Sequence, residues 1–255
     1  MDITKLYHCT SFGSLESILR SGEFWPSYCL EKADYLNKTY EFAFAMVCFA
    51  DLMQAEVKPH LKKFNKDCYI QMSKTWAKRN GLSNVIYYDR SSALSVTFKH
   101  LIQDIIKQEG NKEGKNEGES NKTVEMSDQV RYFSLLMAYF KQYEGFYWND
   151  NKGDWSENKT QFYTEREWRY IPLVHGDADY YLDPIQFKDK SIRKQKHDQL
   201  IKRNYTLKFG WNDIETIGVT NWSNKIEIVH LLTQNHSIRF TDAWNKIKVM
   251  QKWHF

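Results

Sequence analysis

The sequence is poor in the two residues that most often interrupt regular structure, with 11 glycines and 4 prolines among 255 residues. This composition excludes collagen-like, linker-rich and largely disordered chains. No apolar run approaches the roughly 18 residues that a membrane-spanning helix needs, so no membrane contact is expected. The opening MDITKLYHCTSF mixes acidic, basic and polar residues where a secretory signal needs an apolar run. We therefore expect a cytoplasmic protein.

Cysteine is also scarce, and charge of neither sign predominates. The four cysteines, Cys9, Cys29, Cys48 and Cys68, have no Cys-x-x-Cys or Cys/His zinc spacing, so buried reduced thiols are expected rather than a metal site or a disulfide. The 36 Lys and Arg against 32 Asp and Glu leave a net charge of +4, which is compatible with nucleic-acid binding but does not establish it. In contrast, 9 Trp, 16 Tyr and 15 Phe are enough to build a large core.

Local patterns predict a mixture of strands and helices. Leu6–His8 reads as a strand, and helical spacing of apolar residues follows between the cap region at Ser11 and Gly22. Further strands are predicted at 42–49 (alternatively a helix from about 40), 68–72, 85–88, 162–172, 205–209 and 214–219, and further helices at 52–62, 74–80, 92–107, 130–143 and 224–234. The fold class is therefore α+β, with a mixed, mostly antiparallel sheet and flanking helices.

One segment differs sharply in composition. Residues 107–125 hold no aromatic side chain and a single large aliphatic one, Val124. Such a segment buries too little to offset its ordering entropy, so it is predicted to be a mobile surface insertion. The helix expected after it is apolar enough to pack on the same core, which predicts one domain over residues 1–255.

Two pairs of residues could carry chemistry. His8 and Thr10 lie two apart on the first strand and so share a face, although a single histidine near a strand end is more often structural. Glu165 and Glu167 would share a face of the predicted 162–172 strand, where two like charges are tolerated only on a solvated edge or at a functional site. Their aromatic neighbours favour the functional site, and Arg166 and Arg169 can offset some of the charge.

A third candidate is the aromatic loop at 24–28, whose rings could stack on a base or a nicotinamide or could simply pack on the core. Other sites are not indicated. The sequence has no phosphate-binding glycine loop, no zinc-protease motif, no nucleophile elbow and no complete calcium loop.

The string LYHCTSFGSLESILRSG at 6–22 resembles the opening of mono-ADP-ribosyltransferases of the diphtheria-toxin and DarT-like kinds. The wider chain resembles the AbiGi family of abortive phage-resistance proteins. That resemblance rests on PSYCLE at 26–31, MVCFAD at 46–51, the segment from Ser73 to Leu82 and FYTEREWRYIP at 162–172. Together these pieces cover about two thirds of the chain in the expected order.

The resemblance implies an ADP-ribosyltransferase-like split sheet with NAD as co-substrate in its cleft. It implies Glu167 and Glu165 as catalytic residues, because a fixed carboxylate would stabilise the positive charge that develops on the ribose. It places NAD against five further residues, His8, Thr10, Ser27, Tyr28 and Phe49, the last at the position of a second-strand tyrosine. No metal is implied.

The leading hypothesis is an NAD-dependent ADP-ribosyltransferase toxin of bacterial phage defence that releases nicotinamide. Lys188–Arg203 carries seven Lys and Arg against Asp189 and Asp198, which would suit a nucleic-acid acceptor, RNA such as mRNA slightly ahead of DNA, and equally a merely solvated helix. A cognate antitoxin or chaperone is the expected protein partner. The alternative is a non-catalytic antitoxin or a binding or sensor module of the same fold.

Overall fold

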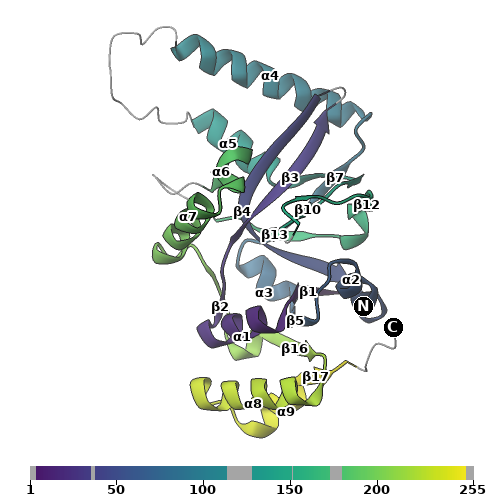
Figure 1. Ribbon diagram of the computed structural model, residues 1–255, viewed down its shortest axis with the longest axis vertical. Helices are drawn as coiled ribbons and strands as arrows, with labels where there is room; N and C mark the ends of the chain where they lie inside the picture. The colour runs from purple at the N-terminus through teal and green to yellow at the C-terminus, as the bar shows by residue number, and fades with distance from the viewer. Residues whose placement is uncertain (1–3, 36–37, 114–127, 151, 173–179, 251–255) are drawn as a thin grey trace.

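The computed structural model describes residues 4–35, 38–113, 128–150, 152–172 and 180–250. Its centre is a sheet in the order β17-β16-β5-β1-β4-β13-β6, with β3 and β14 also paired to β4 (Figure 1). All of these pairs are antiparallel except β16 with β17. The strands of this sheet are β1 (Lys5–Thr10), β3 (Ser27–Tyr35), β4 (Lys38–Leu52), β5 (Cys68–Met72), β6 (Ser83–Asn84), β13 (Trp168–Tyr170), β14 (Tyr181–Leu182), β16 (Ile214–Val219) and β17 (Ile247–Val249).

Short strand pairs and flanking helices complete the described structure. The short strands are β2 (Glu23–Phe24), β7 (Ile86–Tyr88), β8 (Phe140–Gln142), β9 (Glu144–Gly145), β10 (Trp148–Asn149), β11 (Asp154–Trp155), β12 (Thr160–Gln161) and β15 (Leu207–Lys208). The helices are α1 (Phe12–Ser21), α2 (Gln54–Lys63), α3 (Lys74–Arg79), α4 (Ala93–Glu113), α5 (Asp128–Met137), α6 (Pro184–Lys188), α7 (Lys190–Lys202), α8 (Trp222–His236) and α9 (Phe240–Lys246), with 3-10 turns η1 (Phe162–Glu165) and η2 (Trp211–Asp213). The predicted α+β class with a mostly antiparallel sheet is confirmed.

The first helix follows from its sequence signals. Ser11 accepts a hydrogen bond from the Ser14 N–H at the start of α1, and Gly22 ends the helix with φ +71°, a left-handed conformation that glycine adopts without strain. Leu15 and Leu19 are buried on its inner face. Helix α3 begins in the same way, because the Ser73 side chain accepts a hydrogen bond from the Trp76 N–H. These local elements lie where the sequence predicts them.

The long strand β4 links two parts of an elongated molecule. Figure 1 shows α8 and α9 at one end and α4 at the other, with the hairpin of β3 and β4 reaching toward α4. One core cluster lies among α1, β5, β16 and α8, and a second lies around the β3–β4 hairpin. Because β4 contributes to both clusters, residues in its middle lie at the centre of the molecule.

Several predicted boundaries are wrong. The predicted strand 162–172 is split: Phe162–Glu165 forms the 3-10 turn η1, Arg166 is left-handed with φ +45°, and only Trp168–Tyr170 is strand. Since an αL residue breaks the two-residue alternation of side chains, Glu165 and Glu167 do not share a strand face.

Other helix and strand boundaries also differ from the predicted ones. The helix predicted at 130–143 ends at Met137, because Phe140–Gln142 pairs in parallel with β7. Residues 107–113 of the predicted insertion continue α4, and 114–125 lie outside the described residues. The predicted loop at 24–28 is largely strand, since Ser27 and Tyr28 begin β3. The helix predicted last in the chain is followed by α9 and β17.

Gly218 on β16 offers a test of how tightly the sheet face is packed. Its partner across the sheet is Tyr69, and a Cβ added at Gly218 would meet the Tyr69 ring at 2.0 Å. We expect Gly218→Ala to lower the free energy of unfolding by about 1–3 kcal/mol, because rigid ring atoms must shift. Urea denaturation measures the loss. Gly13→Ala is the matched control, since nothing lies within 4 Å of its Cβ, and an equal loss at both positions would contradict the explanation.

None of the helices in the described part of the chain is long and apolar enough to cross a membrane.

Candidate functional site

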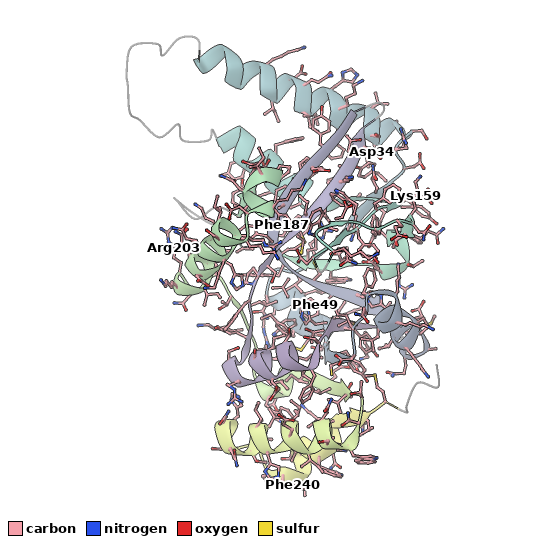
Figure 2. The ribbon with its side chains drawn as sticks, in the orientation of Figure 1. Asp34, Phe49, Lys159, Phe187, Arg203 and Phe240 are labelled. Carbon is pink, nitrogen blue, oxygen red and sulfur yellow. The ribbon has the colours of Figure 1, made fainter. Side chains whose placement is uncertain are left out.

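A cavity of about 800 Å³ opens at the centre of the molecule. All seven residues that the sequence singles out line it: His8, Thr10, Ser27, Tyr28, Phe49, Glu165 and Glu167. In Figure 2 the labelled Phe49 lies near the middle of the molecule, far from Phe240 on α9. The structure therefore brings together residues that are up to 159 positions apart in the chain (Glu167 minus His8).

Strand β4 provides the scaffold for this convergence. It pairs with β1 through Tyr7 and Ala50, and with β13 through Trp168 and Phe49. Residues next to these pairs, His8 on β1 and Glu167 just before β13, thus come to the same cavity from strands that both pair with β4. The resemblance of the first strand predicts that His8 and Glu167 lie in one cleft. It does not by itself establish the NAD-binding and catalytic roles assigned to them.

His8 is held in a defined orientation and is neutral at pH 7. Its Nδ1 lies 2.9 Å from the carbonyl oxygen of Cys48, which can only accept, so Nδ1 carries the proton and Nε2 is left as an acceptor. Its ring packs against Phe24 and Phe49, with centroids 4.9 and 5.5 Å away. Burial lowers the pKa of His8 to about 4.

This pKa shift predicts acid sensitivity. The unfolded chain protonates His8 near pH 6.5 and the folded chain only near pH 4, so the unfolded state gains protons first on acidification. We expect the stability contributed by neutral His8 to be complete above pH 6.5 and to fall between pH 6.5 and 4, by at most on the order of 3 kcal/mol. His8→Gln should flatten the pH dependence of the urea midpoint over this window. A His8→Gln slope as steep as that of the parent would contradict the assignment.

Partly on the wall of the same cavity, a set of three carboxylates and three cations forms what we call the ion network: Glu31, Glu165, Glu167, Lys63, Lys141 and Arg169. Arg169 is 0 % exposed and donates from Nε to Glu167 at 2.9 Å, while its Nη2 reaches Glu31 at 2.5 Å. Lys141 Nζ lies 2.7 Å from the other oxygen of Glu167. The formal charges of the six residues cancel.

The network changes the chemistry available to Glu167. Both of its oxygens are engaged by cations, and the cations Arg169 and Lys141 hold its pKa well below the usual range despite burial. Its backbone N–H donates to the Tyr87 hydroxyl at 2.9 Å, which fixes its position further. The role of stabilising a ribosyl cation stays a prediction for Glu167, whose charge is already offset by Arg169 and Lys141.

Glu165 has a different environment. It is 7 % exposed, and its Oε1 has no hydrogen-bond partner among the described residues. The nearest cations are Lys63 and Lys141, each 3.6 Å away, at ion-pair but not hydrogen-bond distance. Burial is the main cause that raises the pKa of Glu165. Glu165 is therefore an under-satisfied carboxylate on the cavity wall.

Sequence reasoning named Arg169 only as a partial charge offset for the two glutamates, and it assigned no site role to Lys141 and Glu31. Arg169 lies two residues from Glu167, and that spacing on a strand is a local signal for a same-face ion pair. Lys141 and Glu31 lie 26 and 136 residues from Glu167, and no local pattern links them to it. Only the pairing of strands reveals the network.

Other expected features are only partly present. Tyr28 is 6 % exposed and so is not an exposed ring for an unstacked base, whereas Trp25 is 40 % exposed. All four cysteines are free, but only Cys68 is fully buried, and Cys9, Cys29 and Cys48 line the cavity. In the described ranges no group of three or more His, Cys, Asp or Glu side chains is arranged to hold a metal ion.

The basic stretch at 188–203 contains the whole of α7. Three of its cations are in ion pairs: Lys188 with Glu41 at 3.9 Å, Arg193 with Asp150 at 2.8 Å and Lys194 with Asp198 at 3.1 Å. His197 of the same helix lines the cavity. The nucleic-acid acceptor predicted from this stretch therefore has no support beyond the charge itself.

Comparison with known proteins bears on the function. The chain is similar to "Abortive phage resistance protein AbiGi" of Lactococcus lactis subsp. cremoris, with 24% identity over 229 residues that cover 82% of this chain and 87% of that protein. No solved structure is significantly similar to the chain, so the ADP-ribosyltransferase-like form of the sheet stays a prediction.

A family model matches residues 22–220, and its description reads "Putative abortive phage resistance protein AbiGi, antitoxin". This description contradicts the leading hypothesis of an ADP-ribosyltransferase toxin and agrees with the antitoxin alternative. NAD as co-substrate stays a prediction. Because the match spans well over half of the sequence, the chain belongs to the AbiGi family of abortive phage-resistance proteins.

Proposed function

We propose that this chain is the antitoxin of an abortive-infection system and that it acts by binding a cognate toxin rather than by catalysis. The family description supports an antitoxin. The structural observation that carries the non-catalytic part is the engagement of both Glu167 oxygens by Arg169 and Lys141. The cavity then has a wall of balanced charge, which suits binding better than cleavage of a glycosidic bond.

A growth assay tests the proposal. The chain is expressed alone, and together with its cognate toxin, in a host that lacks both. We expect no growth arrest from the chain alone, restored colony formation on co-expression, and recovery of the two proteins as one complex. Growth arrest by the chain itself, or unrelieved arrest by the toxin, would contradict an antitoxin role.

A second measurement addresses catalysis directly. The purified chain is incubated with NAD, and free nicotinamide is measured with and without RNA. We expect release at the rate of a buffer blank. Catalytic turnover that disappears in Glu165→Gln would overturn the non-catalytic part of the proposal, while leaving the neutralisation result to stand on its own.

A further inference from the structure

The region of the cavity around Glu165 combines a buried carboxylate with aromatic walls. His60, Phe64, Tyr147 and Phe162 all line the same cavity as Glu165. The Phe64 ring contacts His60 and Tyr147, with centroids 4.9 and 5.9 Å away. Phe162 belongs to the same 3-10 turn as Glu165, and Lys141 Nζ lies 4.5 Å from its ring centre. A flat ring that entered here would find aromatic surfaces and a carboxylate whose Oε1 has no hydrogen-bond partner among the described residues.

The charges around Glu165 restrict what can bind it. A ligand has to supply hydrogen-bond donors, because a buried acceptor without a partner costs about 1–3 kcal/mol. A cationic donor is disfavoured, since Lys63 and Lys141 already lie 3.6 Å from the two Glu165 oxygens and would repel it. A neutral group with adjacent N–H donors satisfies both conditions.

We propose that this part of the cavity binds the guanine base of a nucleotide, with Glu165 accepting hydrogen bonds from guanine N1–H and N2–H. Guanine is neutral and flat, and it carries those two donors side by side. Adenine presents an acceptor, N1, beside its amino group, so it would place a lone pair against the carboxylate. Exposed Lys66, which also lines the cavity, would attract the phosphate. The inference goes beyond the antitoxin role and rests on the cavity alone.

Isothermal titration calorimetry on the full chain tests the proposal with GMP, IMP and AMP at pH 7.5. We expect saturable binding of GMP. IMP, which lacks the N2 amino group, should bind about tenfold more weakly, and AMP should be weaker still by a similar factor, because each lost donor leaves the carboxylate less satisfied. The three ligands share one phosphate and one ribose, so the order reports on the base edge.

Two variants locate the site. Glu165→Gln should weaken GMP by about tenfold or more and reduce the preference over AMP, since an amide presents one acceptor where the carboxylate presents two. Glu157→Gln, whose side chain is 80 % exposed, is the matched control and should bind like the parent. Circular dichroism of each variant shows whether it is folded; if Glu165→Gln is not, the order of the three nucleotides on the parent decides.

Several results would overturn the proposal. These are the absence of GMP binding at millimolar concentration, equal affinity for GMP and AMP, or unchanged GMP affinity in a folded Glu165→Gln variant. Agmatine is an additional probe, because its guanidinium has the same adjacent N–H donors and a positive charge. Agmatine that displaces GMP would show that the site prefers a cation. Failure of the growth assay would leave these outcomes unaffected, so the two proposals fail separately.

Discussion

Replacement of Arg169 by methionine is expected to lower the free energy of unfolding by about 3–5 kcal/mol, the scale found when one partner of a buried ion pair is removed. Arg169 is 0 % exposed and its guanidinium contacts both Glu31 and Glu167. Methionine fills much of the same volume but leaves two carboxylates with less compensation. Urea denaturation followed by tryptophan fluorescence measures the change.

Two comparisons make this prediction specific to the buried charge. Arg79→Met removes an ion pair with Asp213 in which the arginine side chain is 64 % exposed, and it should cost no more than about 1 kcal/mol. Adding Glu167→Gln and Glu31→Gln to Arg169→Met should recover part of the loss, because the uncompensated charges are then gone. A triple variant no more stable than Arg169→Met would mean that the loss arises from packing instead.

Elements that carry their own signals could be predicted from the sequence. Helix α3 is bounded by Ser73, which caps it, and strand β5 occupies Cys68–Met72 as expected. The cap of α3 is made within a few residues along the chain, whereas β5 follows a strand-like local pattern and then pairs with the distant strands β1 and β16. Failures occur where distant partners decide. Residues 138–143 continue a helical pattern, yet Phe140–Gln142 is a strand because β7 pairs with it.

In the candidate site, too, some features could be predicted from the sequence and others depend on residues far away in the chain. The first-strand motif located His8 and Thr10, and a resemblance located Glu167, so some of the residues that line the cavity were predictable. Their ion pairing was not. Whether Glu167 is a free carboxylate depends on Lys141 and Arg169, and Lys141 reaches it from a strand that the sequence predicts as helix. The expectation of catalysis rested on Glu167 without its counter-ions.

Replacement of Trp76 by alanine has the second large expected effect, a loss of about 3–5 kcal/mol in the free energy of unfolding. Trp76 is 1 % exposed and packs against Phe24 and Phe49, with ring centroids 6.0 and 5.6 Å away. Both phenylalanines line the cavity, so the void left by the indole lies directly behind its wall. Denaturant titration gives the stability, and GMP titration of the same variant shows whether the cavity keeps its shape.

The variant Trp76→Phe distinguishes the contribution of aromatic packing from that of the indole N–H. The indole Nε1 has no hydrogen-bond partner among the described residues, so its removal costs no hydrogen bond there. Phenylalanine keeps most of the contact with Phe24 and Phe49, and we expect it to lose less than half as much stability as alanine. A Trp76→Phe variant as unstable as Trp76→Ala would show that the indole N–H does have a partner in solution, and the packing explanation would then fail.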